Sequence, residues 1–101
     1  MNPGPSEATA TKTLLLVDDE HYFRRFVGEI VRRNFGYRLI EARDGEEAVA
    51  LFQAERPAVV LLDINMPRKT GIETLPALRA MDAEAQIIML TSISEELVVE
   101  E

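Results

Sequence analysis

Apolar residues in this chain occur in two patterns: short runs, and longer stretches in which they recur every three or four positions. Largely uninterrupted runs occupy residues 13–18, 58–63 and 86–91, and a run of the same length that mixes apolar and charged residues occupies residues 37–42. A short continuous apolar run is typical of a strand that is covered on both faces of its sheet. We therefore expect four strands, most of them buried on both sides.

The first periodic stretch, residues 21–35, predicts an amphipathic helix. Its apolar residues fall at positions i, i+3, i+4, i+7 and i+8, and its arginines lie largely off that stripe. The stripe consists of Phe23, Phe26, Val27, Ile30 and Val31. We expect these five side chains to pack in the core rather than to form a docking surface.

Further helices are expected after the second, third and fourth strands. Asp44 is the expected N-cap of a helix that runs to residue 55, with Glu47 as its capping partner three residues later. The segment 72–81 predicts another helix, with a kink at Pro76. A last helix is expected to begin near Ser94.

Strict alternation of strands and helices with short connections predicts parallel strands and right-handed crossovers. The expected fold is therefore α/β, a doubly wound parallel sheet with helices on both faces. In such a sheet the carboxyl ends of the strands share one edge, where ligands bind. Asp18 and Asp19 end the first strand, Asp63 ends the third and Thr91 ends the fourth. If the first and third strands are neighbours, these side chains converge.

Convergence of the three carboxylates has an energetic cost. Two ionised carboxylates about 5 Å apart repel by roughly 3 kcal/mol at an effective dielectric constant of 20. A hard divalent cation offsets that repulsion, and Mg²⁺ suits one or two carboxylates together with waters and a phosphate. A carboxylate beside a metal also acts as a nucleophile on phosphorus, giving an aspartyl phosphate. Taken one at a time, Asp18 as a helix N-cap, Asp63 as a turn residue and Thr91 as a strand-end residue remain alternative interpretations.

Composition excludes several other classes of protein. The chain has 101 residues, enough for one domain, and a net charge of −7 with a pI near 4.7 disfavours direct binding to nucleic acid. It lacks cysteine, which fits a reducing compartment. Residues 1–12 have no secretory pattern and are expected to form a flexible tail. No apolar run approaches the roughly 18 residues of a membrane span, so we expect no membrane interaction.

Four motifs in this order resemble the receiver domain of two-component response regulators. They are "LLLVDDE", "VVLLDINMP", the pair Thr70 and Gly71, and "IIMLTS". Asp63 lies 44 positions after Asp19 and 28 positions before Thr91, as expected of a receiver. The resemblance runs from about Lys12 to the end of the chain, so residues 13–101 are expected to form the domain. It implies a flavodoxin-like sheet with the strand order 2-1-3-4.

The resemblance also implies a role for each matching residue. Asp63 would accept a phosphoryl group from a phosphohistidine on a sensor histidine kinase or a phosphotransfer protein. Asp19, Asp63 and the main-chain carbonyl of Asn65 would bind Mg²⁺, or Mn²⁺ in its place, and Asp18 would act through a water. Thr91 would donate its hydroxyl to the phosphoryl oxygens and so move the loop after strand four. The chain would then be a cytoplasmic signalling domain rather than an enzyme, limited to self-phosphorylation from phosphodonors and slow self-dephosphorylation.

Other polar residues near these motifs have plainer interpretations. We expect His21 to be exposed in the first helical turn, because in this family the donor histidine belongs to the partner. Arg68 and Lys69 are expected to be solvated, although they would also attract phosphodonors. Met66 and Pro67 match the family's loop, in which the proline stiffens the metal-binding backbone.

One departure from the receiver pattern concerns the end of the sequence. Receivers continue into a fifth strand with a phosphoryl-pairing lysine and a fifth helix, whereas Lys12 and Lys69 are the only lysines here. We therefore expect the domain to be incomplete at its C-terminus and phosphorylation to be weakened. We also expect strand four to be an uncovered apolar edge, able to pair with a second copy of the chain. The output would be an effector protein or a further domain that the sequence lacks.

Two alternatives to the phosphorylated receiver remain open. A receiver-like module that binds partners without phosphorylation fits the missing lysine. A phosphatase with an aspartyl intermediate is disfavoured, because such enzymes carry two acids one residue apart after strand one, whereas Asp18 and Asp19 are adjacent. A nucleotide-binding domain is disfavoured because no glycine-rich turn follows the first strand.

Overall fold

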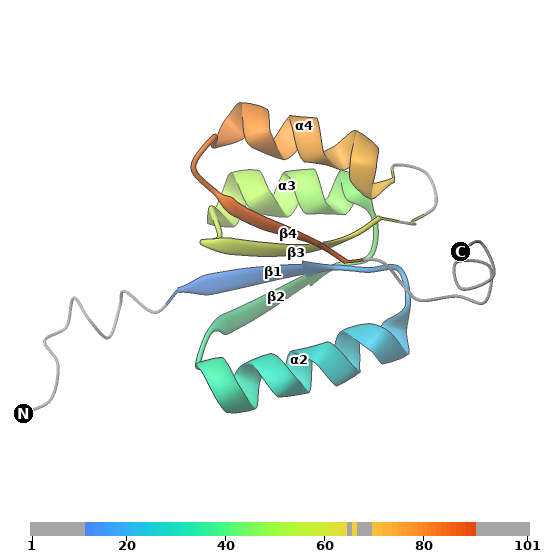
Figure 1. Cartoon of the computed structure of the whole chain (residues 1–101), viewed down its shortest axis with the longest axis vertical. Helices are drawn as coiled ribbons and strands as arrows, with labels where there is room; N and C mark the ends of the chain where they lie inside the picture. Colours follow the sequence, from blue (N-terminus) through green and yellow to red (C-terminus); the bar gives the residue numbers. More distant parts are fainter. Residues whose placement is uncertain (1–11, 65, 67–69, 91–101) are drawn as a thin grey trace, which may run out of the picture.

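The computed structural model describes residues 12–64, 66 and 70–90, which form four strands and three helices in alternation (Figure 1). The strands are β1 (Thr13–Val17), β2 (Arg38–Ala42), β3 (Val59–Asp63) and β4 (Gln86–Leu90). The helices are α2 (His21–Phe35), α3 (Gly45–Glu55) and α4 (Gly71–Met81). The predicted bounds are correct to within one residue for all seven elements. The helix expected near Ser94 lies outside the described residues.

The four strands form one sheet in the order β2-β1-β3-β4, with every neighbouring pair parallel. This confirms the predicted strand order and the predicted α/β class. β1 lies between β2 and β3, and the register pairs Val17 with Leu62. Asp18 and Asp63, the next residues along these strands, therefore leave the sheet at the same level. None of the described helices is long and apolar enough to cross a membrane.

Helices cover the two faces of the sheet unequally: α2 lies on one face, and α3 and α4 lie on the other (Figure 1). Side chains of β1 alternate between the two cores. Leu15 and Val17 pack with Phe52 of α3 and Leu78 of α4, and Leu16 packs with α2 on the opposite face. This strand is buried on both sides, as its continuous apolar run predicts.

The apolar stripe predicted to pack α2 into the core is largely exposed, so that prediction is wrong for three of its five residues. Phe26 is 64% exposed, Ile30 41% and Phe23 36%. Val31 is buried and Val27 is half-buried.

The reason is the position of a glycine on the helix. Gly28 is buried against β2, and a Cβ atom at this position would lie 2.8 Å from Cδ2 of Leu39. The helix therefore contacts the sheet along a line through Gly28 and Val31, and the bulkier Phe26 and Ile30 lie to the side of that contact. Periodicity identifies an apolar stripe but not which part of it meets the sheet.

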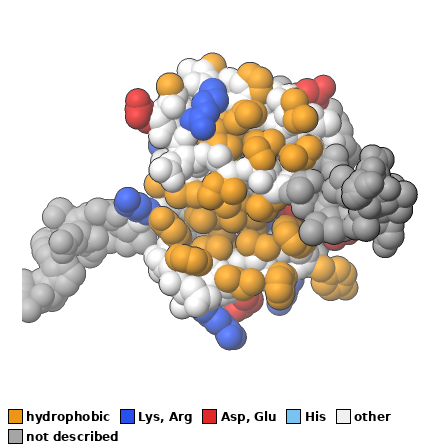
Figure 2. All heavy atoms as spheres, viewed as in Figure 1, with side chains coloured by type: hydrophobic (Ala, Val, Ile, Leu, Met, Phe, Trp, Pro, Cys, Tyr) orange, Lys and Arg blue, Asp and Glu red, His pale blue; other side chains and the backbone are white. Residues whose placement is uncertain are grey.

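Part of the sheet face beside α2 forms an apolar groove of about 280 Å³. Its lining comes from β1, α2, the connection between α2 and β2, β3 and β4, and consists of Leu14, Val31, Phe35, Tyr37, Val59, Leu61, Gln86 and Ile88. Figure 2 shows hydrophobic side chains gathered between α2 and the layer of α3 and α4. Within the described part of the chain β4 pairs with β3 alone, and Ile88 is 50% exposed. This agrees with the predicted apolar edge; pairing with a second copy stays a prediction.

Side chains cap both helices that follow β2 and β3. The carboxylate of Asp44 accepts a hydrogen bond from the Glu47 N–H at 2.8 Å, as predicted. The carboxylate of Glu47 accepts a hydrogen bond at 2.8 Å from the N–H of Arg43, the residue before the predicted N-cap, so the reciprocal bond is displaced by one residue. A complete capping box starts α4, where Thr70 and Glu73 each accept a hydrogen bond from the other's N–H.

Candidate metal centre

Three carboxylates meet at the carboxyl edge of the sheet. Asp18, Asp19 and Asp63 each offer one oxygen atom, and these three atoms lie within 4.8 Å of one another. Asp18 and Asp63 are buried, at 6% and 4% exposure, whereas Asp19 is exposed. The predicted convergence is confirmed for all three acids.

Backbone hydrogen bonds hold the first two acids where β1 ends. The N–H of Asp18 donates to the carbonyl of Ala42 at 3.0 Å, which carries the β1–β2 pairing one residue beyond the strand. The N–H of Glu20 donates to Oδ1 of Asp18 at 2.8 Å. This bond spans two residues and closes a tight turn that directs the chain into α2.

Asp63 is held by close contact between the end of β3 and the start of α4. The N–H of Gly71 donates to the carbonyl of Ile64 at 2.9 Å, and the N–H of Ile64 donates to the carbonyl of Leu90 at 3.0 Å. A Cβ atom at Gly71 would lie 2.1 Å from the carbonyl oxygen of Asp63. Because backbone atoms at that distance cannot yield, residue 71 must be glycine for α4 to begin here.

The loop after β3 is anchored by Met66, which is 6% exposed and belongs to the core between the sheet, α3 and α4. Asn65, Pro67, Arg68 and Lys69 lie outside the described residues.

Thr91 also lies outside the described residues. The roles expected of Asn65 and Thr91 therefore stay predictions. Leu90, which precedes Thr91, accepts a hydrogen bond from the residue after Asp63, so the described chain leaves β4 next to the acidic cluster.

Burial raises the pKa of the Asp18 carboxyl, and the negative charges of Asp19 and Glu20 raise it further. The hydrogen bond from the Glu20 N–H and the charge of Arg24 lower the pKa and only partly compensate. A raised pKa means that the ionised form of Asp18 is disfavoured in the folded chain. A bound cation would remove that penalty.

The chemistry of this donor set fits Mg²⁺. All three groups are carboxylate oxygens, which hard divalent cations prefer, and two of them are withdrawn from water. One exposed member leaves a side of the cluster open to waters or to a phosphate. Mg²⁺ usually keeps several such ligands besides one or two carboxylates.

Two polar residues beside this cluster, Arg24 and Glu41, were not singled out from the sequence. The Nη1 atom of Arg24 donates to the main-chain carbonyl of Asp18 at 2.7 Å, and its Nε atom forms an ion pair with Glu41 of β2 at 3.0 Å. The sequence signal was an arginine on the second turn of the helix that follows the acids. His21 is exposed, as expected, and its Nδ1 lies 3.5 Å from Nη2 of Arg24.

A parallel sheet of this order with three acids at its carboxyl edge is the arrangement expected of a receiver domain, whose family is one of signalling phosphoacceptors rather than catalytic enzymes. The sequence profile of the response regulator receiver domain matches residues 14–101. The chain belongs to this family, and the acidic cluster fits the family's phosphorylation site. The resemblance stated from the motifs is thereby confirmed.

Individual relatives agree with this assignment. The chemotaxis protein CheY of Halobacterium salinarum is 41% identical over 85 residues, which cover 84% of this chain and 70% of that protein. The response regulator TrrA of Thermotoga maritima, solved in complex with Mg²⁺-BeF, is 37% identical, with a TM-score of 0.78. The match covers 83% of this chain and 72% of TrrA.

A CheX–CheY–BeF₃–Mg²⁺ complex from Borrelia burgdorferi contains a further similar chain, 31% identical with a TM-score of 0.78. That match covers 93% of this chain and 72% of the other. Several curated relatives are much longer: the chain spans 32 to 34% of three probable transcriptional regulators named ycf27 and 46% of the transcriptional regulatory protein PdtaR of Mycobacterium tuberculosis.

Proposed function

We propose that Asp63 accepts a phosphoryl group from a phosphohistidine of a sensor histidine kinase or a phosphotransfer protein, and that this transfer switches the conformation of the chain. The observation that carries the proposal is the cluster of three carboxylate oxygens within 4.8 Å at the carboxyl ends of β1 and β3. Histidine kinases phosphorylate receivers, usually in the cytoplasm, and that is the compartment we propose.

In this reaction a carboxylate oxygen of Asp63 attacks the phosphorus atom. An O–P bond forms, the N–P bond of the phosphohistidine breaks, and the imidazole of the donor leaves with the electron pair. Asp63 is suited to this role because it ends β3, where the contact of Gly71 with its backbone fixes the strand end.

The remaining residues hold the site together in this proposal. Asp19, Asp63 and the carbonyl of Asn65 hold Mg²⁺, with Asp18 acting through a water. The ion supplies neutralisation of the negative charge shared by the carboxylates and the incoming phosphate.

Thr91 is proposed to donate its hydroxyl to the phosphoryl oxygens. Support comes from the bond between the Ile64 N–H and the carbonyl of Leu90, which ties the end of β4 to the residue after the phosphoacceptor. A change at Asp63 is thus adjacent to the segment that follows β4. The readout would be by an effector protein or by a further domain.

The test is the intact mass of the folded chain after incubation with acetyl phosphate, with and without Mg²⁺. We expect the gain of one phosphoryl group, which requires Mg²⁺ and is absent in Asp63→Ala. Asp82→Asn, in the turn between α4 and β4, is the matched control and should be labelled like the wild type. Labelling that survives in Asp63→Ala, or that is unaffected by removal of Mg²⁺, would contradict the proposal.

A receiver that binds partners without phosphorylation is the second candidate. Its support is the exposed apolar surface of α2, where Phe26 and Phe35 are 64% and 65% exposed. A folded chain that binds Mg²⁺ but gains no phosphoryl group would favour this alternative.

A further inference from the structure

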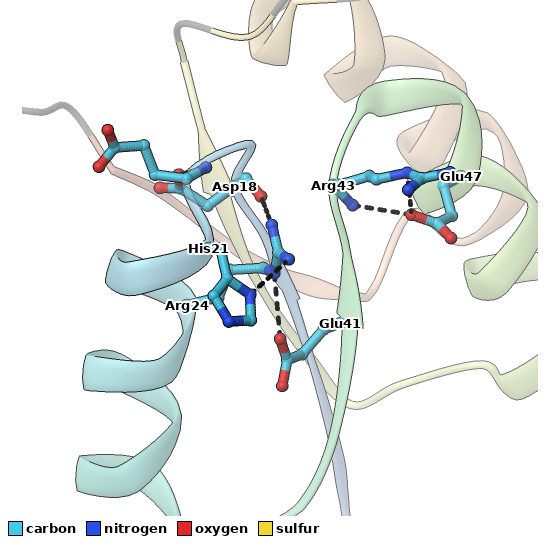
Figure 3. A network of polar contacts seen from close by, with 7 residues as sticks. Asp18, His21, Arg24, Glu41, Arg43 and Glu47 are labelled. Atoms are coloured by element: carbon cyan, nitrogen blue, oxygen red, sulfur yellow. Dashed lines mark hydrogen bonds and ion pairs between the residues drawn. The ribbon is translucent and has the colours of Figure 1, made fainter.

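Arg24 forms a connection between α2, β2 and the end of β1 (Figure 3). Its Nη1 atom donates to the main-chain carbonyl of Asp18 at 2.7 Å, and its Nε atom donates to the Glu41 carboxylate at 3.0 Å. The side chain of Arg24 is 14% exposed, unlike that of Arg33 on the same helix, which is 78% exposed. A half-buried arginine held by two hydrogen bonds to different elements has little rotational freedom.

The carbonyl that Arg24 holds belongs to the peptide bond between Asp18 and Asp19. A peptide unit is planar, so fixing its oxygen fixes the orientation of the whole unit. That orientation determines the direction in which Asp19 leaves the backbone. The Glu20 N–H, bonded to Oδ1 of Asp18 at 2.8 Å, fixes the side chain of Asp18 in the same turn.

The bond to Glu41 fixes the guanidinium of Arg24 from β2, and not only from the turn that follows β1. The guanidinium is planar and presents its donors in a fixed fork, so the bond from Nε to Glu41 also directs Nη1. Glu41 lies on β2, whose pairing with β1 places Leu16 beside it. The sheet itself thus sets the position of the arginine, and the arginine sets that of the Asp18–Asp19 peptide.

We propose that Arg24 is a positioning residue of the acidic site, which holds the Asp18–Asp19 peptide so that the carboxylates converge on a bound Mg²⁺ ion. The inference rests on the proposed function in that it requires the cluster to bind Mg²⁺. The proposal predicts that replacing Arg24 weakens Mg²⁺ binding, even though the loss of a nearby positive charge would by itself strengthen it.

The direction of this effect separates positioning from two simpler roles. If Arg24 acted only through its charge, its removal would strengthen binding of a cation, since like charges repel. If Arg24 only attached the helix to the sheet, the folded fraction would change but the affinity of the folded chain for Mg²⁺ would not. Weaker binding by a folded variant is expected from positioning alone.

The experiment compares Mg²⁺ affinity by isothermal titration calorimetry in the wild type, Arg24→Gln and Glu41→Gln. We expect the dissociation constant of Arg24→Gln to rise about tenfold, the lower end of the range for residues that orient metal ligands. Glu41→Gln should shift in the same direction by less, although the loss of its negative charge would itself weaken cation binding. Arg24→Lys keeps the positive charge but lacks the planar fork that reaches both acceptors, so weaker Mg²⁺ binding by this variant retains the test of the proposal if Arg24→Gln fails to fold.

Arg38→Gln is the matched control. It breaks an ion pair between β2 and Glu55 that has a similar length, 3.1 Å, at the opposite end of the strand. Its dissociation constant should equal that of the wild type. In metal-free samples, the amide resonances of Asp19 and Glu20 should move in Arg24→Gln but not in this control.

The outcomes distinguish the two levels of the proposal. A wild-type chain that binds no Mg²⁺ overturns the proposed function and this inference together. A wild-type chain that binds Mg²⁺, with Arg24→Gln binding as tightly or more tightly, overturns the inference and leaves the proposed function standing.

Discussion

Replacing Asp19 with asparagine removes one of three charges from the acidic cluster while nearly preserving the shape of the side chain. Asp19 is the exposed member of the cluster, so this change disturbs the core less than a change at Asp18 or Asp63 would. In the absence of a divalent cation the charges repel one another. We therefore expect Asp19→Asn to stabilise the metal-free fold.

The magnitude follows from the spacing of the oxygens. Two unit charges 4.8 Å apart repel by about 3.5 kcal/mol at an effective dielectric constant of 20 and by about 0.9 kcal/mol in water. Asp19 interacts with two other acids but is exposed, which places it near the lower value for each pair. We expect a gain of about 1–2 kcal/mol in the free energy of unfolding.

Urea denaturation followed by circular dichroism measures this gain, first in the presence of EDTA. Glu84→Gln is the control, because it removes the same charge at the opposite edge of the sheet. The two residues are separated by the length of the sheet, which for a strand of five residues such as β4 is about 17 Å. This exceeds the Debye length of about 8 Å at physiological ionic strength. We expect its stability to lie within about 0.5 kcal/mol of the wild type.

Addition of Mg²⁺ should reverse the order of stability. An ion present at a hundred times its dissociation constant stabilises the wild type by about 2.7 kcal/mol, whereas a variant with one fewer carboxylate gains less. An Asp19→Asn chain that is less stable than the wild type in EDTA would refute the repulsion argument. An unchanged order in saturating Mg²⁺ would refute a metal site at these residues.

Three further substitutions test the geometry around the cluster. Gly71→Ala should lower the free energy of unfolding by about 3 kcal/mol in urea denaturation, because the added Cβ would meet the backbone of Asp63 at 2.1 Å. Gly28→Ala, whose Cβ would clash only with the flexible side chain of Leu39, should change it by no more than about 1 kcal/mol. Equal losses in the two variants would contradict this contrast. Thr70→Ala should lose about 1 kcal/mol and Thr70→Ser little, since a serine hydroxyl also caps α4. Asp18→Asn should stabilise the metal-free chain near pH 7. Because the pKa of Asp18 is raised in the folded chain, the wild type loses stability as the pH rises from 3.8, the ordinary pKa of this carboxyl, through the raised pKa. The stability gained by Asp18→Asn should therefore shrink in melts at lower pH. A gain that persists at pH 3 would contradict the sign of the pKa shift.

The order of elements and the acidic cluster were predictable from the sequence because both depend on simple rules. Continuous apolar runs specify strands of a covered parallel sheet, and the carboxyl ends of such strands share an edge. Asp18, Asp19 and Asp63 each directly follow or end such a run, so the alternation alone brings them together once β1 and β3 are neighbours.

The exposed part of α2 and the role of Arg24 were not predictable by the same rules. Burial on a helix depends on where it touches the sheet, and Gly28 displaces that contact from the centre of the apolar stripe. Arg24 lies off the stripe and reads as a surface residue. Its function depends on Glu41, which is 17 residues away and reaches it only through the pairing of β1 with β2.

The pairing of β1 with β3 joins two segments that are separated by α2, β2 and α3. An ion held by acids from both strands would cross-link the first and second halves of the domain. In a chain cleaved between α3 and β3, near Arg56, the ion would add to the strand pairing and the shared core that hold the two pieces together, so a chelator would weaken their association.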